Sequence, residues 1–434
     1  MKSTHSKALQ CAVFASFALL STPFGTAVQA QSSNQEKALN PRISRVTTIA
    51  AFPRGIVPLG QELVILSRGR VRSSGGVSAD VQDNAGTLYT INPNVRQNAS
   101  EPNVSQEVRE NGTPLALPTA PPFRLWDVTS TPPWDDRETD RPYCVVRFHE
   151  ASQNFFICAF SGVDKPRSAT TAGGRSFSKN LTDAILRYDL RNNTWFEVER
   201  HDIEAGGLYP HNDPAVSPPP HGWLNGPNNI HVQGNWLYGV GKDNSLLVRY
   251  NLAPLLQDSE AGALESEWIL GSELPLTSGG SVLLEGHSAL AWHNGYCYLG
   301  TRTNSVVVRF PMNEDGSIPQ PMQGELIAKF DPYNHTTGKS ADITDITFDD
   351  SGNLYVLNAE PSRVHRFVPN PQSIYDARNG AKTPWVNLAE ILGTPRMKSE
   401  NILFQSPNKL FITSGDGYTY QSGADGTLYV VEWD

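Results

Sequence analysis

The sequence predicts an all-β fold made of six similar four-stranded units, and three observations support this prediction. First, Gly226–Leu252 reads as three short apolar strands separated by the turn-rich segments 233–235 and 241–244. Second, the same three-strand pattern recurs along the chain. Third, the last copy has no fourth strand after it, and 45–52 can supply one from the other end of the chain. A six-bladed β-propeller closed by its N-terminal strand fits all three, because closure removes the exposed edge of a linear array.

Each unit is expected to consist of an inner, a central, a third and a fourth strand. The inner strands are expected at 54–58, 144–148, 228–232, 288–292, 344–348 and 400–404. The central strands are expected at 62–66, 155–159, 236–240, 296–300, 353–357 and 409–413. The third strands are expected at 86–92, 184–190, 245–251, 305–311, 363–369 and 426–432. These strands are apolar because blades bury both faces against their neighbours.

Fourth strands are expected after five of the six units, at 123–130, 193–200, 265–272, 324–331 and 382–391. Four of them carry a tryptophan suited to the widening space between blades: Trp126, Trp195, Trp268 and Trp385. Four third strands carry an arginine before their aromatic residue: Arg187, Arg249, Arg309 and Arg366. Recurrence at equivalent positions indicates scaffold rather than a binding site. The six units together are expected to form one domain, residues 43–434.

The first thirty residues are expected to be a signal peptide. Two lysines precede the apolar run 8–20, and residues 28–30 end in Ala30, a small residue suited to signal peptidase. The mature chain would begin with a flexible stretch, 31–42, before the propeller. We therefore expect a secreted or periplasmic protein, with no membrane span because no later stretch is long and apolar enough.

The charge of the mature chain excludes some partners. Removing residues 1–30 removes two of the 35 basic residues and none of the 44 acidic ones, which leaves a net charge of −11. A protein this acidic is a poor general binder of nucleic acid or of an anionic membrane. The expected partner is a small molecule, a glycan or an envelope protein.

Three cysteines remain in the mature chain. Cys144 and Cys158 fall on the two strands of one expected hairpin, roughly opposite each other, and an exported protein allows a disulfide between them. The alternative is that both are buried thiols that pack as small apolar groups. Cys297 has no evident partner, and nothing in the sequence near it would lower its pKa, so a catalytic cysteine is not expected.

Long loops are expected on one face of the propeller. Loops from the second to the third strand, and from the fourth strand to the next inner strand, emerge on the same face. The long inserts fall in these loops, at 67–85, 161–183, 201–226, 271–286 and 414–425. Variable loops on a rigid ring commonly carry function, so this face is the expected binding face.

Two stretches resemble known propellers. The segment DITDITFDDSGNLYVLNAEPSRVHRF (342–367) resembles an NHL repeat, and GPNNIHVQGNWLYGVG (226–241) is similar to the SMP-30/gluconolactonase/paraoxonase group. The resemblance extends over most of 43–434 and implies a six-bladed propeller. It also implies a divalent cation in the central channel, held by a Glu, two Asn and an Asp at the starts of four inner strands. Ca²⁺ would suit such oxygen ligands.

The matching positions of this sequence depart from that ligand set. The first positions of the inner strands are Arg54, Cys144, Asn228, Ser288, Thr344 and Glu400. Sliding by one residue gives Gly55, Val145, Asn229, Ala289, Asp345 and Asn401. Neither register reproduces the family's set, and Arg54 would add a positive charge to the cage. Asn228, Asp345 and Glu400 are the residues through which a divalent cation such as Ca²⁺ would still be held.

The channel mouth is expected to gather the polar residues of these positions, which could surround one ligand. The candidates are Arg54, Asn228, Asn229, His287, Asp345, Glu400 and Asn401. Arg54 and Glu400 stand at equivalent positions of neighbouring blades, so they could pair and orient an acidic or hydroxylated ligand. The alternative is that these groups only hydrogen-bond to one another and to channel water.

Two loop clusters are further candidates. A basic cluster could receive an anionic ligand, or could simply be solvated surface; it comprises Arg68, Arg70, Arg72, Lys165, Arg167, Arg175 and Lys179. The insert 201–221 carries three histidines at spacings too wide for a structural zinc site, so a surface flap is expected. No nucleophile elbow, phosphate loop or His-Glu-x-x-His motif occurs.

These observations predict an extracytoplasmic propeller that binds a ligand or partner through its channel and loop-rich face. The alternative is a lactonase-type hydrolase that uses a divalent cation in the channel. The sequence leaves open whether the protein is an enzyme.

Overall fold

The computed structural model describes residues 41–49, 53–67, 88–94, 112–114, 143–159, 182–192, 194–202, 224, 226–242, 244–258, 264–330, 342–359, 361–369, 384–393, 397–415 and 426–434. They belong to one compact unit, Asn40–Asp434. The expected signal peptide lies outside the described residues, as does the expected flexible stretch up to residue 40. Arg42 already belongs to a strand.

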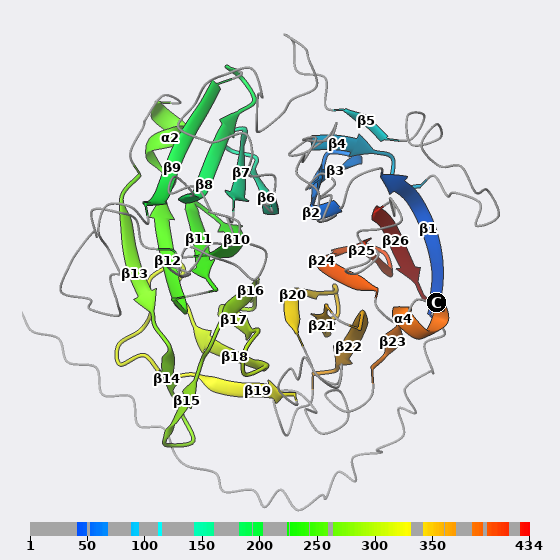
Figure 1. Cartoon of the computed structure of the whole chain (residues 1–434). Coiled ribbons are helices and arrows are strands. Elements are labelled where there is room, and N and C mark those ends of the chain that lie inside the picture. The colour runs from blue at the N-terminus through cyan, green and yellow to red at the C-terminus, as the bar shows by residue number, and fades with distance from the viewer. Residues whose placement is uncertain are drawn as a thin grey trace, which may run out of the picture. The chain divides into compact units, whose positions relative to one another are not determined.

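Six four-stranded antiparallel sheets form a β-propeller, which confirms the predicted fold class (Figure 1). Blade 1 contains β2 (Pro53–Leu59), β3 (Glu62–Ser67), β4 (Leu88–Ile91) and β5 (Gly112–Pro114). Blade 2 contains β6 (Tyr143–His149), β7 (Asn154–Ala159), β8 (Thr182–Asp189) and β9 (Thr194–Asp202). Blade 3 contains β10 (Pro227–Gln233), β11 (Trp236–Gly241), β12 (Leu246–Asn251) and β13 (Ser266–Leu270).

The second half of the chain repeats this plan. Blade 4 contains β16 (His287–His293), β17 (Tyr296–Thr301), β18 (Val306–Pro311) and β19 (Glu325–Lys329). Blade 5 contains β20 (Ile343–Phe348), β21 (Leu354–Asn358), β22 (Arg363–Phe367) and β23 (Val386–Asn387). Blade 6 contains β24 (Lys398–Gln405), β25 (Lys409–Gly415), β26 (Gly426–Glu432) and β1 (Arg42–Ile49).

The ring is closed by β1, which pairs antiparallel with β26 from Arg42 opposite Glu432 to Ile49 opposite Gly426. The predicted closure is therefore confirmed, with the strand three residues earlier than the expected 45–52. The seam is packed like any other blade interface, since Val46 of β1 and Leu428 of β26 share an apolar cluster with Ile56 and Leu63 of blade 1.

Two predicted fourth strands were wrong. In blade 1 the fourth strand is β5, whereas the expected 123–130 lies outside the described residues. In blade 5 the expected 382–391 forms only the two residues of β23. The chain then turns into the helix α4 (Leu388–Ile391), because the side chain of Asn387 accepts a hydrogen bond from the Glu390 backbone and caps its first turn.

The other described elements are short. The helix α2 (Pro254–Gln257) follows β12, and the predicted insert 271–286 contains a hairpin of β14 (Glu273–Pro275) and β15 (Ser281–Leu283). No helix among the described residues is long and apolar enough to cross a membrane.

The recurring arginines of the third strands stabilise the scaffold, as their recurrence predicts. Arg249 lies over the ring of Trp236 and pairs with Glu267 on the fourth strand. Arg309 repeats this arrangement in blade 4, where it lies over Tyr296 and pairs with Glu325. The recurring Trp385 contacts the rings of Tyr355 and Trp433 in an equally structural role.

Candidate ligand site at the inner strands

The inner strands face the centre of the propeller, and each has a β-bulge near its start. Their neighbour contacts run around the ring in the order β2, β6, β10, β16, β20, β24 and back to β2 (Figure 1). The ladder to the central strand shifts by one residue in every blade: between Pro53 and Gly55, Tyr143 and Val146, Pro227 and Asn229, His287 and Ala289, Ile343 and Asp345, and Ser399 and Asn401. A bulge re-aims side chains without ending the strand. Polar residues are therefore presented at the same level in several blades.

Arg54 and Glu400 form the ion pair that the sequence predicts. The Arg54 Nη2 atom lies 3.0 Å from Glu400 Oε1, and both side chains are almost fully buried. Lys398 joins them, with its Nζ atom 3.1 Å from the same oxygen. Lys398 precedes Glu400 by two residues on β24, beside the bulge at which Glu400 stands.

The charges around Glu400 keep its carboxylate ionised. Burial alone would raise the pKa of Glu400, but the positive charges of Arg54, Lys398 and Arg302 outweigh burial and lower it to about 2. Burial lowers the pKa of Lys398, although Glu400 partly offsets this effect. Arg302 is itself paired with Asp342, at 2.5 Å between Nε and Oδ1. Three cations from different blades therefore act on one carboxylate.

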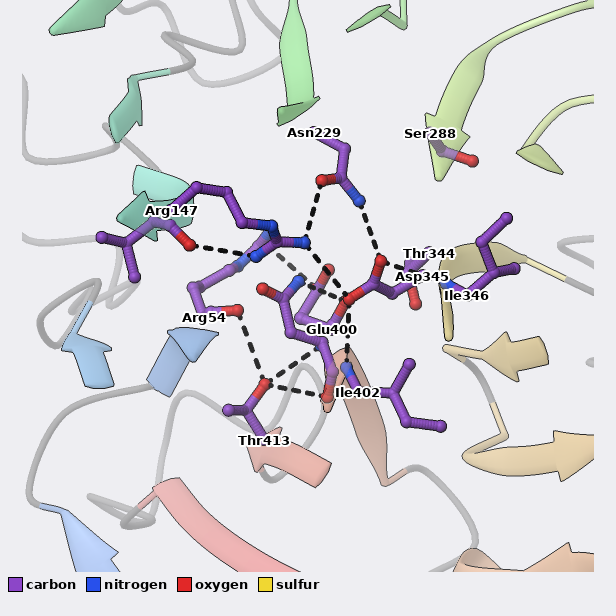
Figure 2. Close-up of polar contacts among 12 residues, drawn as sticks. Arg54, Arg147, Asn229, Ser288, Thr344, Asp345, Ile346, Glu400, Ile402 and Thr413 are labelled. Atoms are coloured by element: carbon purple, nitrogen blue, oxygen red, sulfur yellow. Dashed lines mark hydrogen bonds and ion pairs between the residues drawn. The ribbon is translucent and has the colours of Figure 1, made fainter. Parts of the chain in front are cut away.

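Asp345 forms a second cluster, and Figure 2 shows its contacts with Arg147 and Asn229. Its Oδ1 atom accepts hydrogen bonds from Asn229 Nδ2 and from the Ile346 backbone, both at 3.0 Å. Its Oδ2 atom accepts from the backbone nitrogen of Ile402 at 3.1 Å and lies 3.8 Å from Arg147 Nη2. Burial raises the pKa of Asp345, while Arg147 and these donors partly offset that effect. The carboxylate connects four blades.

The remaining predicted channel residues have structural contacts. Asn228 donates to the Ser288 carbonyl of the next blade at 3.4 Å. Asn401 donates from its side chain to the Glu400 carbonyl at 2.7 Å and from its backbone to Thr413 Oγ1 at 3.0 Å. His287 is fully buried, and burial lowers its pKa to about 4, so its ring is neutral at pH 7. Of the seven predicted residues, Arg54 with Glu400 and Asn229 with Asp345 are thus brought into side-chain contact.

The residues at the centre do not fit a divalent cation. Ca²⁺ needs six or more oxygen ligands at about 2.3–2.6 Å. Here the oxygens of Asp345 accept N–H donors, and Oε1 of Glu400 faces both Arg54 and Lys398. Asn228, the third predicted ligand, bonds the backbone of blade 4. Among the described residues, no group of three or more His, Cys, Asp and Glu could hold a metal ion.

The other candidates are only partly described. The basic cluster of Arg68, Arg70, Arg72, Lys165, Arg167, Arg175 and Lys179 lies outside the described residues. The histidine-bearing insert also does, apart from the end of β9, so both stay predictions. Cys158 is a buried thiol in the apolar core between blades 2 and 3, in line with the packing alternative. The side chain of Cys144 is not described. Burial raises the pKa of Cys297, which agrees with an inert thiol.

Sequence reasoning missed Arg147, Lys398, Arg302 and Asp342. Arg147 and Lys398 lie on inner strands but outside the two registers that the resemblance picked out. Arg147 did carry a sequence signal, because it is the one charged residue of the apolar run 143–148, whereas Lys398 is followed by three polar residues and carried none. Arg302 and Asp342 flank strands in loops, where a charge carries no such signal.

No protein-family model matches the chain, and no curated protein matches it. Solved structures that are similar include a luciferin-regenerating enzyme, at 12% identity over 91% of this chain and 95% of that one, with a TM-score of 0.44. A gluconolactonase from Xanthomonas campestris is similar at 13% identity over 91% of this chain and 90% of that one, with a TM-score of 0.46. The six-bladed fold is shown by the sheet topology, and membership of the resembled family stays a prediction.

Proposed function

We propose that this protein is an exported propeller that binds a small acidic or hydroxylated molecule at the inner-strand site. The observation that carries the proposal is the buried cluster in which Arg54 Nη2 and Lys398 Nζ lie 3.0 and 3.1 Å from Glu400 Oε1, and these positive charges lower the pKa of Glu400 despite its burial. The same positive field would stabilise the anionic group of a ligand. Strongly perturbed ionisable groups cluster at functional sites more often than elsewhere.

The chemistry of the cluster defines the ligand class. The Arg54 guanidinium offers planar N–H donors that match a carboxylate, and Lys398 adds a compact second cation. Glu400, held as a carboxylate, accepts a hydrogen bond from a hydroxyl group. A small molecule that carries both a carboxylate and hydroxyl groups would use all three side chains.

The energetic cost of the cluster supports a role beyond stability. A buried ion pair is often no more stabilising than well-packed apolar residues of similar volume. Arg54 and Glu400 nevertheless occupy the bulge position at which other inner strands carry uncharged residues such as Ser288 and Thr344. Charge is thus concentrated at the junction of blades 6 and 1.

A binding screen tests the proposal. The purified mature protein is titrated calorimetrically with a panel of small hydroxylated carboxylates, with the corresponding neutral polyols as the comparison. At least one carboxylate should bind, and Arg54→Ala should weaken it by about tenfold or more because a charge-assisted hydrogen bond is lost. The matched control is Arg42→Ala, which removes an arginine from an exposed ion pair with Asp434. Unchanged affinity in Arg54→Ala, or no binding across the panel, would contradict the proposed site.

The export component has its own measurement. Expression of the full chain in a host with a general secretion pathway should yield protein outside the cytoplasm. Its mass should be that of a chain whose first residue is near Gln31. Retention of the intact N-terminus in the cytoplasm would refute this component and leave the ligand proposal untouched.

A further inference from the structure

The arrangement around Asp345 joins opposite sides of the ring. The inner strands contact one another in the order β2, β6, β10, β16, β20 and β24, so β6 and β20 are three places apart in a ring of six. Arg147 belongs to β6 and Asp345 to β20, and their side chains meet (Figure 2). This contact therefore spans the axis of the propeller.

The Arg147 guanidinium lies between the oxygens that a channel cation would use. Its Nη2 atom donates to Asn229 Oδ1 at 3.3 Å and lies 3.8 Å from Asp345 Oδ2. Its Nη1 atom donates to the Val146 carbonyl at 3.0 Å, which fixes the orientation of the guanidinium plane. Burial lowers the pKa of Arg147 and Asp345 partly offsets this effect, but the pKa of a guanidinium is ordinarily so high that the group remains a cation near neutral pH.

Three hydrogen-bond donors and the Arg147 guanidinium surround the Asp345 carboxylate. An ionised carboxylate has about four lone-pair sites. Asn229 Nδ2 and the Ile346 backbone take two on Oδ1, while the Ile402 backbone and Arg147 face Oδ2. A divalent ion at 2.3–2.6 Å would have to displace at least one of these groups.

We propose that Arg147 supplies the fixed central cation of this propeller, which makes the centre independent of metal and braces blades 2, 3, 5 and 6 against one another. The Arg147 side chain thus takes the place that a coordinated metal ion would have at the centre. It neutralises the buried Asp345 carboxylate and holds the Asn229 amide in one orientation. This inference does not depend on the ligand proposed above, because it concerns Asp345 rather than Glu400.

Rescue by a soluble cation tests the proposal. Arg147→Ala should lower the thermal midpoint, because it leaves a buried carboxylate without its cation. Methylguanidinium has the shape of the lost group, and at about ten times its Kd it should restore the folding equilibrium of this variant about tenfold. It should not stabilise the wild type or Arg249→Ala, which removes an arginine from the partly exposed pair with Glu267. If methylguanidinium stabilises Arg147→Ala no more than it stabilises Arg249→Ala, the proposal is overturned.

The wild type provides a measurement that needs no variant. Elemental analysis should find no stoichiometric divalent metal, and EDTA or millimolar Ca²⁺ should leave the thermal midpoint unchanged. A bound metal ion whose removal destabilises the wild type would refute the proposal even if Arg147→Ala failed to fold. Arg147→Lys keeps a cation at this position and should lie between the wild type and Arg147→Ala in stability.

Discussion

Replacing Glu400 with Gln is the sharpest perturbation of the charged cluster. The substitution keeps the shape of the side chain and removes the charge that faces Arg54 and Lys398. A pKa that falls from 4.5 in the unfolded chain to about 2 in the folded one corresponds to about 3 kcal/mol of stability at pH 7. Because Glu400 is 4% exposed, solvent screening reduces this value little. Glu400→Gln should therefore lose about 3 kcal/mol of unfolding free energy.

The sign of the pH dependence follows from the lowered pKa. A carboxylate whose pKa is lower in the folded state stabilises the fold above the unfolded value of 4.5 and loses that contribution as the pH falls to about 2. The difference between the wild type and Glu400→Gln should shrink from about 3 kcal/mol at pH 7 to about 1.5 kcal/mol at pH 3 and about 0.4 kcal/mol at pH 2, and should vanish only below pH 2.

Urea denaturation at several pH values measures this difference. The midpoint and slope are determined for the wild type, Glu400→Gln and Glu314→Gln, whose glutamate is exposed in a turn and serves as the control. Equal slopes for the variants would assign the change to stability rather than to compactness. A Glu400→Gln protein as stable as the wild type at pH 7, or a difference that is the same at pH 3, would refute the electrostatic reasoning.

Three further predictions concern the packing and closure of the ring. Gly55→Ala should destabilise the protein more than Gly234→Ala in urea, because its Cβ would lie 2.6 Å from a backbone nitrogen of blade 2, whereas Gly234 has only an unfavourable φ of +55°. Ser288→Ala should cost about 1 kcal/mol, measured in the same way, because its hydroxyl donates to the Ile343 carbonyl of the next blade at 2.6 Å. Deleting 42–49 should lower the thermal midpoint and raise light scattering, because it leaves β26 as an exposed edge. Equal stability in any of these comparisons would count against the contact named.

The blade pattern could be predicted because each blade repeats the same local pattern of apolar strands and turn residues. Runs such as Trp236–Val240 are apolar, rich in residues suited to strands and bounded by turns, and both faces of the sheet are buried in the folded protein. The weak predictions were the outer strands. The fourth strand of blade 5 ended early because Asn387 starts a helical turn, which is a local preference that competes with strand pairing.

The ion pair of Arg54 and Glu400 could be predicted because both residues stand at one repeated position of adjacent blades. Arg54 and Glu400 are equivalent because each is the residue at the bulge of its inner strand. Arg147 could not be found in this way, because its partner Asp345 lies across the ring and no spacing along the chain relates opposite blades. Contacts between adjacent blades are readable from a repeat, whereas contacts across the axis need the closed ring.

This difference indicates how the centre of a propeller acquires its properties. A repeated position receives six side chains, one from each blade, and sequence changes at that position can be compared blade by blade. Here blades 6 and 1 carry charge where blades 4 and 5 carry Ser288 and Thr344, so the ring is electrostatically asymmetric around its axis. A ligand bound at the centre would consequently meet different chemistry on different sides of the axis, with Arg54 and Glu400 on one side and Ser288 and Thr344 on another.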